Sequence, residues 1–201
     1  MNSAVPIFPY RNNIENVIKW SKEQKIITKL LLAMVFTCLT GILAQMRIYL
    51  PWTPVPITLQ TIAVFGSGLI LGPVFGSLSQ ILYLLFGILG VNWFANYSGG
   101  VNTIVGPTGG YLVGFIIASL ITGLIREKLV QKDSKRIIVF AVLIGINFTL
   151  VYGLGLIQLS LWYWLIQGQI LPIGQLLLKG FVPFIIGDLL KILGVTIYIK
   201  Y

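Results

Sequence analysis

The sequence predicts an all-α integral membrane protein of six transmembrane helices, and two features of its composition support this. Of its 201 residues, 57% are apolar and only 9% are charged, whereas a soluble domain carries about 25% charged residues. The apolar residues form runs that contain few polar side chains, such as ITLQTIAVFGSGLILG and GGYLVGFIIASLITGLI. These runs are expected to face lipid, since a soluble bundle needs polar outer faces.

The first predicted helix covers residues 28–46 and follows a polar segment of mixed composition, residues 1–27. That segment carries a short amphipathic patch at Val17, Ile18 and Trp20, next to lysines. The patch predicts an interfacial segment on the cytoplasmic membrane surface, with a disordered tail as the alternative. Residues after this segment, 28–201, are expected to form a single six-helix membrane domain.

A proline-rich segment, RIYLPWTPVPIT, comes after the first helix. Its three prolines are incompatible with a regular helix, so a loop or re-entrant stretch is expected here. The second and third helices are predicted at residues 57–71 and 74–91. Because the dipeptide Gly72-Pro73 between them marks a tight turn, these two helices are expected to form a short hairpin.

The second half of the chain alternates long loops with helices. The segment NWFANYSGGVNTIVGPTGG is rich in Gly, Asn, Ser and Thr, which predicts a long structured loop. A fourth helix at 108–125 follows, then a charged loop at 126–136 and a fifth helix at 137–158. An amphipathic connector with an aromatic belt at Trp162, Tyr163 and Trp164 is expected next. The sixth helix is predicted at 181–199.

Positive charge predicts the orientation of these helices. The formal net charge is +9, and most basic residues fall in two clusters: Arg11, Lys19, Lys22, Lys25 and Lys29, and Arg126, Lys128, Lys132, Lys135 and Arg136. Six crossings place both clusters and Lys200 on one side of the membrane and leave Arg47 and Lys179 on the other. Cytoplasmic loops carry the excess of Lys and Arg, so both termini are predicted to be cytoplasmic.

This arrangement predicts a multi-pass protein of the cell (plasma) membrane with its long, polar, glycine-rich loops together on the outer side. Such loops commonly build binding sites, and a ligand would arrive from outside. The basic residues fit membrane orientation better than nucleic-acid binding, which needs a surface that tracks a phosphate backbone. No nucleic-acid partner is therefore expected.

The absence of several motifs argues against catalysis. The chain has no histidine, so it lacks the commonest metal ligand and the commonest general base. It also has no Walker A pattern, no HExxH and no paired carboxylates. A membrane enzyme that acts on lipid is disfavoured, neither metal nor cofactor is expected, and energy for transport would have to come from a partner chain or a gradient.

Asp188 and Lys191 are the most informative residues, because both lie in the predicted sixth helix at hydrocarbon depth. A charge there costs at least about 2.5 to 3.5 kcal/mol, so such groups normally face an interior cavity and are paired. The spacing i, i+3 places them on one helical face. A ligand site is the favoured interpretation, and a structural ion pair is the alternative.

Two further polar residues flank the outer side. Gln60 lies near the start of the second helix and is either a ligand contact or a link between helices. Arg47 ends the first helix, where it either snorkels to the interface or captures a carboxylate.

Small residues recur at four-residue spacing, which lets helices approach closely. Internal packing is predicted for two glycine rows: Gly68, Gly72 and Gly76, and Gly106, Gly110 and Gly114. A third row on the first helix, Ala33, Thr37 and Gly41, is interpreted either as packing or as a docking face for a membrane partner.

Three stretches, in the right order along residues 30 to 200, together resemble one family: PVPITLQT, SGGVNTIVGPTGGY and PFIIGDLLK. The chain is similar to the BioY family, the biotin-specific S component of energy-coupling-factor transporters. The resemblance implies a six-helix subunit that binds biotin from outside and works with a transmembrane coupling protein and two ATPase subunits. It also implies that the small-residue face of the first helix meets the coupling protein, although Ala33, Thr37 and Gly41 here replace a row of alanines.

The same resemblance, carried over by motif, implies a set of biotin-binding residues: Asp188, Lys191, Ser98, Asn96, Gln60, Arg47 and Tyr111. Biotin combines a planar ureido group, an apolar fused ring and a carboxylate. Asp188 is expected to accept the ureido N–H bonds, Ser98 or Asn96 to serve its carbonyl, and Lys191 or Arg47 to balance the carboxylate. The alternative is a membrane scaffold or channel-type subunit in which Asp188 and Lys191 form only a structural ion pair.

Overall fold

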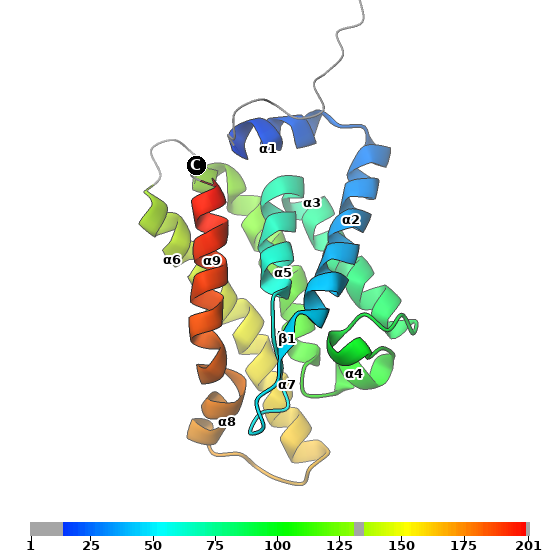
Figure 1. Ribbon diagram of the computed structural model, residues 1–201, viewed down its shortest axis with the longest axis vertical. Coiled ribbons are helices and arrows are strands. Elements are labelled where there is room, and N and C mark those ends of the chain that lie inside the picture. Colours follow the sequence, from blue (N-terminus) through cyan, green and yellow to red (C-terminus); the bar gives the residue numbers. More distant parts are fainter. Residues whose placement is uncertain (1–13, 131–134, 200–201) are drawn as a thin grey trace, which may run out of the picture.

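The structure, a computed structural model, describes residues 14–130 and 135–199, which form a bundle of helices (Figure 1). Arg11 and Lys132 of the predicted basic clusters lie outside the described residues, as does Lys200. Within the described part of the chain, five helical segments are long and apolar enough to cross a membrane: Ile26–Gln45, Gln60–Ile88, Gly109–Leu129, Arg136–Leu165 and Ile173–Tyr198. The prediction of a largely helical membrane protein is confirmed at this level.

The N-terminal part of the described chain contains two helices. Helix α1 (Ile14–Glu23) lies across one end of the bundle (Figure 1), and Ile18 on its inner face is buried. Helix α2 (Ile26–Gln45) runs along the bundle and matches the predicted first helix, residues 28–46, within two residues.

The proline-rich segment forms a small two-stranded sheet that the prediction of an all-α fold missed. Strands β1 (Arg47–Ile48) and β2 (Ile57–Thr58) pair antiparallel. Arg47 lies opposite Thr58, and Ile48 lies opposite Ile57. The prolines between the strands exclude a helix, and the backbone groups on either side of them pair across the loop.

Helix α3 (Gln60–Ile88) folds back on itself at Gly72, before Pro73. Gly72 has φ 81° and ψ −173°, a conformation essentially restricted to glycine. The Gln60 amide donates a 2.8 Å hydrogen bond to the hydroxyl of Tyr83, 23 residues further on. In a straight helix these residues would be about 35 Å apart, so the predicted hairpin is confirmed.

The polar loop after α3 contains two short helical turns, η1 (Ala95–Tyr97) and α4 (Val101–Val105). Helix α5 (Gly109–Val130) follows and extends beyond the predicted end of the fourth helix at residue 125. The last turns of α5 therefore contain charged residues that were predicted to lie in a loop. Nothing in the stretch LIREKLV breaks a helix.

Helices α6 (Arg136–Ile146) and α7 (Tyr152–Leu165) are joined by a π-helical turn, η2 (Asn147–Val151), into one long rod. The predicted end of this helix at residue 158 is wrong. The aromatic residues Trp162, Tyr163 and Trp164 belong to its last turn and not to a connector. The run LIQLSLWYWL contains neither Gly nor Pro, so nothing stops the helix there.

The C-terminal part contains α8 (Ile173–Gly180), the short turn η3 (Val182–Phe184) and α9 (Ile185–Ile199). Helix α9 therefore begins four residues later than the predicted 181. As a result Asp188 lies in its first turn rather than seven residues inside. A carboxylate near a helix N-terminus is stabilised by the helix dipole.

Close approach of helices depends on the predicted glycine rows. A Cβ atom at Gly68 would lie 2.5 Å from the carbonyl oxygen of Ser119, and one at Gly110 would lie 2.2 Å from that of Leu154. These separations are shorter than any real Cβ contact, so side chains larger than hydrogen do not fit there. Internal packing is confirmed for these glycines, which set α3 and α7 directly against α5.

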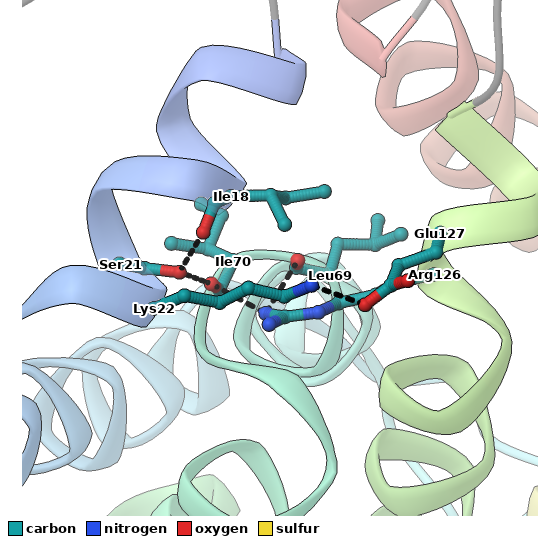
Figure 2. A network of polar contacts seen from close by, with 7 residues as sticks. All are labelled: Ile18, Ser21, Lys22, Leu69, Ile70, Arg126 and Glu127. Atoms are coloured by element: carbon teal, nitrogen blue, oxygen red, sulfur yellow. Dashed lines mark hydrogen bonds and ion pairs between the residues drawn. The ribbon is translucent and has the colours of Figure 1, made fainter.

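Polar contacts hold α1 on the turn of α3 (Figure 2). The Ser21 hydroxyl lies 2.7 Å from the carbonyl oxygen of Ile70, which also accepts a 2.9 Å hydrogen bond from the Arg126 guanidinium. Lys22 and Glu127 form an ion pair between α1 and α5. Carbonyls at the end of a helix have no helical partners, so Ser21 and Arg126 cap the first half of α3 where it breaks.

The two ends of the bundle differ in character. Helix α1 and the C-terminal end of α9 lie at one end (Figure 1). The strand β1 and the short helices α4 and α8 lie toward the other. The proline-rich loop and the Asn/Gly-rich loop are thus gathered at the end opposite α1.

Candidate functional site

A cavity of about 300 Å³ lies where these two loops meet α5, α7 and α9. Its volume is at the lower end of the range of about 300 to 1,000 Å³ typical of small-molecule sites. Aromatic side chains form much of its wall: Tyr49, Phe94, Tyr111, Phe115, Tyr152 and Phe184.

Six of the seven predicted site residues line this cavity: Asp188, Lys191, Ser98, Asn96, Gln60 and Tyr111. They come from α9, the polar loop, α3 and α5. Arg47, the seventh, is not among the lining residues. The fold therefore brings together side chains that are up to 131 positions apart in the sequence, from Gln60 to Lys191.

Asp188 and Lys191 form a buried ion pair at one side of the cavity. The Lys191 ammonium also donates a 2.7 Å hydrogen bond to the carbonyl oxygen of Thr58 in β2. The second carboxylate oxygen of Asp188 accepts two hydrogen bonds of 2.6 Å, from the amide of Asn147 and the hydroxyl of Tyr152. Asp188 is only 1% exposed, so its charge is balanced by contacts within the protein.

Gln60 and its neighbours supply polar groups at a second side. The Gln60 carbonyl oxygen accepts a 2.9 Å hydrogen bond from the Thr58 hydroxyl, while its amide donates to Tyr83. The hydroxyl of Thr61, which also lines the cavity, has no hydrogen-bond partner in the described part of the chain. Buried polar groups normally have partners, so Thr61 is available to a ligand.

The NYSGG loop is a tight, strained turn. Asn96 and Tyr97 have positive φ angles of 68° and 51°, which are uncommon outside glycine. The amide of Phe94 donates a 3.0 Å hydrogen bond to the carbonyl of Ser98, and the Ser98 hydroxyl donates 2.8 Å to the carbonyl of Ala95. This turn holds Asn96 and Ser98 at the cavity wall.

Arg47 contacts two residues of the cavity wall, Asn96 and Tyr49, and the side-chain oxygen of Asn96 lies 3.3 Å from the guanidinium. The guanidinium also lies over the rings of Tyr49 and Tyr97, with its central carbon 5.7 and 5.1 Å from the ring centres. The guanidinium donates a hydrogen bond of 2.9 Å to the side-chain oxygen of Gln45. Its Nε is buried and has no acceptor within the described ranges.

Tyr111 uses its hydroxyl within the protein, because it donates a 2.8 Å hydrogen bond to the carbonyl of Gly180 and so fastens α5 to α8. Its ring packs edge-to-face against that of Tyr152, with 5.7 Å between centres. Tyr111 therefore offers the cavity an aromatic surface and not a free hydroxyl.

Asn147 and Tyr152 were missed by the sequence reasoning, although both contact Asp188. The side-chain amide of Asn147 stands within the apolar run VLIGINFTLVYG, and a polar group in such a run indicates a buried contact. The two residues are five apart, however, and in a regular helix they would point about 140° away from each other. Only the π-helical turn between them directs both to one carboxylate.

The small-residue row on α2, interpreted either as packing or as a docking face, is buried within the described part of the chain. Ala33 and Thr37 are fully buried, and the Thr37 hydroxyl donates a 2.8 Å hydrogen bond to the carbonyl of Ser79 in α3. A Cβ atom at Gly41 would lie 3.2 Å from the ring of Trp93. The row therefore lets α2 approach its own neighbours closely.

The side chains around the cavity are suited to binding. Within residues 14–130 and 135–199, no three His, Cys, Asp or Glu side chains are placed to hold a metal ion. The cavity combines aromatic walls with an acid–ammonium pair on one side and amide and hydroxyl groups on another. Apolar walls with a few convergent polar groups are typical of sites for small molecules.

Comparison with known protein families gives a match over nearly the whole chain. A model described as "BioY family" matches residues 14–201. A protein of Methanothermobacter thermautotrophicus described as "Probable biotin transporter BioY" is 43% identical, over 64% of this chain and 81% of that protein. The "Biotin transporter BioY" of Thermotoga maritima is 37% identical, over 82% of this chain and 89% of that protein.

A solved structure also resembles the fold. It is described as the S-component for biotin from an ECF-type ABC transporter, and it superposes with a TM-score of 0.74. The match covers 87% of this chain and 89% of the other, at 25% sequence identity. Sequence and fold therefore point to the same kind of protein.

Proposed function

Because this chain belongs to the BioY family, we propose that it captures biotin from outside the cell and delivers it across the membrane as the S component of an importer. It is a multi-pass membrane protein and a transporter component, not an enzyme. The observation that carries the proposal is the cavity beside the buried pair of Asp188 and Lys191. A purely structural ion pair needs no such cavity.

The polar groups around the cavity match the chemistry of biotin. Asp188 accepts from the ureido N–H groups, because an ionised carboxylate is an acceptor only. The Asn96 amide donates to the ureido carbonyl, since the Ser98 hydroxyl already donates to the carbonyl of Ala95, and the aromatic wall covers the fused ring. Lys191 is already paired with Asp188, so we assign the biotin carboxylate to Arg47, whose Nε lacks an acceptor among the described residues.

The proposal extends to partners. The similar solved structure is described as one component of an ABC transporter, and this chain has no Walker A pattern. A transmembrane coupling protein and two ATPase subunits would supply the energy that this chain cannot obtain through a P-loop of its own.

Purified protein in liposomes is expected to bind labelled biotin saturably, with a dissociation constant between nanomolar and micromolar, but not to accumulate it against a gradient. The physical reason is that the cavity supplies binding while the chain has no energy source. Equilibrium binding measures the affinity, and the radioactivity retained after filtration measures accumulation. Absence of saturable binding would favour the scaffold or channel-type alternative, and accumulation by the chain alone would overturn the need for ATPase subunits.

Six crossings with both termini in the cytoplasm are part of the same proposal. The α3 hairpin supports an even number of passes, as does the placement of α1 and the end of α9 at one end of the bundle (Figure 1). A cysteine introduced at exposed Lys25 should react with a membrane-impermeant maleimide only after the cells are opened, whereas one at exposed Trp52 should react in intact cells. The opposite pattern would reverse the orientation.

A further inference from the structure

Asn147 is a buried amide whose position is not explained by packing. It is fully buried and does not line the cavity. Its nitrogen donates a 2.6 Å hydrogen bond to Asp188, while its oxygen has no partner in the described part of the chain. A half-satisfied amide in a helix interior is unfavourable, so an apolar residue would serve stability alone better.

The backbone around Asn147 is unusual in a way that serves this contact. The π-helical turn η2 begins at Asn147, and the backbone N–H of Tyr152 donates to the Asn147 carbonyl across five residues. Such turns are rare and occur frequently at functional sites. Here the turn directs the Asn147 amide and the Tyr152 hydroxyl to the same oxygen of Asp188.

These contacts determine how the carboxylate is presented. One oxygen of Asp188 is held by two donors from the α6–α7 rod, and the other is held by Lys191 from α9 itself. The carboxylate is therefore restrained in its rotation, and Asp188 is one of the residues that line the cavity. Tyr152 lines the cavity and can touch a ligand directly, whereas Asn147 does not.

We propose that Asn147 is a positioning residue for ligand capture, which orients the Asp188 carboxylate toward the ureido N–H groups through the π-helical turn. This inference rests on the proposed function, since it assumes that biotin occupies the cavity. Asn147 acts through Asp188, so its removal should impair the recognition of N–H groups in particular and not binding in general.

The test compares biotin with an analogue that is methylated on a ureido nitrogen and so lacks one N–H donor. Dissociation constants for both are measured on wild-type protein and on the Asn147→Leu variant. We expect the variant to bind biotin about 10-fold more weakly, in line with the loss of a hydrogen bond to a charged group. Its preference for biotin over the analogue should fall at least about fivefold below that of wild type.

Thr149→Val is the matched control, because Thr149 lies in the same π-helical turn but is exposed, and its hydroxyl donates a hydrogen bond to the carbonyl of Gly145. Its affinity for biotin and its preference for biotin over the analogue should equal those of wild type. If Asn147→Leu does not fold, Asn147→Ala replaces it. An equal loss of affinity for both ligands, or no loss, would overturn the positioning role. Failure of wild type to bind biotin would instead reject the proposed function.

Discussion

Replacing Asp188 with Asn is expected to weaken biotin binding by about 100-fold or more. The substitution keeps the shape of the side chain but removes its charge. Lys191 would then lack its counter-ion, and the amide group cannot accept every hydrogen bond that the carboxylate accepts. Breaking a buried ion pair on one side costs about 3 to 5 kcal/mol, which corresponds to a factor of 100 or more in affinity when the cost falls on the bound state.

Folding should suffer less than binding. Lys191 lines the cavity, so water can reach its ammonium group in the ligand-free protein and reduce the cost of the missing charge. Thr196→Val is a suitable control, because Thr196 is also buried on α9 and its hydroxyl donates a hydrogen bond to the carbonyl of Ile192 one turn earlier. Titration with labelled biotin and the melting temperature in detergent give the two quantities. A parallel loss of both would assign Asp188 to structure alone.

Gly123→Ala is expected to lower the melting temperature by about 5 to 10 °C. A Cβ atom at Gly123 would lie 2.4 Å from the backbone nitrogen of Pro73 and 2.5 Å from the carbonyl carbon of Gly72. Neither atom can move without disturbing the α3 turn. Overpacking of this kind costs about 1 to 3 kcal/mol and occasionally more, and each kcal/mol shifts the midpoint by about 2 to 4 °C in a chain of this size.

Gly145→Ala makes the same chemical change where there is room. Apart from its chain neighbours and its own helix backbone, no heavy atom of the described chain lies within 4 Å of a Cβ atom at Gly145 in α6, and alanine is the better helix former. This variant should melt at or slightly above the wild-type temperature. If Gly123→Ala were as stable as Gly145→Ala, α5 would not approach the α3 turn as closely as the structure has it.

Several elements of the fold followed from local features of the sequence. The hairpin in α3 was predicted from the dipeptide Gly72-Pro73, because proline cannot continue a helix and glycine can adopt a positive φ. The predicted ends of α5 and α7 are too early, because they coincide with charged and aromatic residues. Neither kind of residue stops a helix, and both helices run on.

The candidate site was predictable where its residues stand in recognisable motifs. Asp188, Lys191 and Gln60 were singled out because polar groups in apolar helices need a reason to be there, and all three line the cavity. Arg47 lies next to the proline-rich loop as predicted, but it does not line the cavity and contacts its wall through Asn96 and Tyr49. That detail depends on the turn of the NYSGG loop, which no local pattern indicates.

The sequence by itself determined that the chain is a membrane protein, where its first helices break and which charges need partners. Those properties depend on transfer of each segment from water to lipid and on backbone geometry within a few residues. Only the tertiary structure decided that Asn147 and Tyr152 hold Asp188, and that the row around Thr37 faces inward. Contacts between helices depend on the rotation and crossing of each rod, and one π-helical turn changes that rotation for every residue after it.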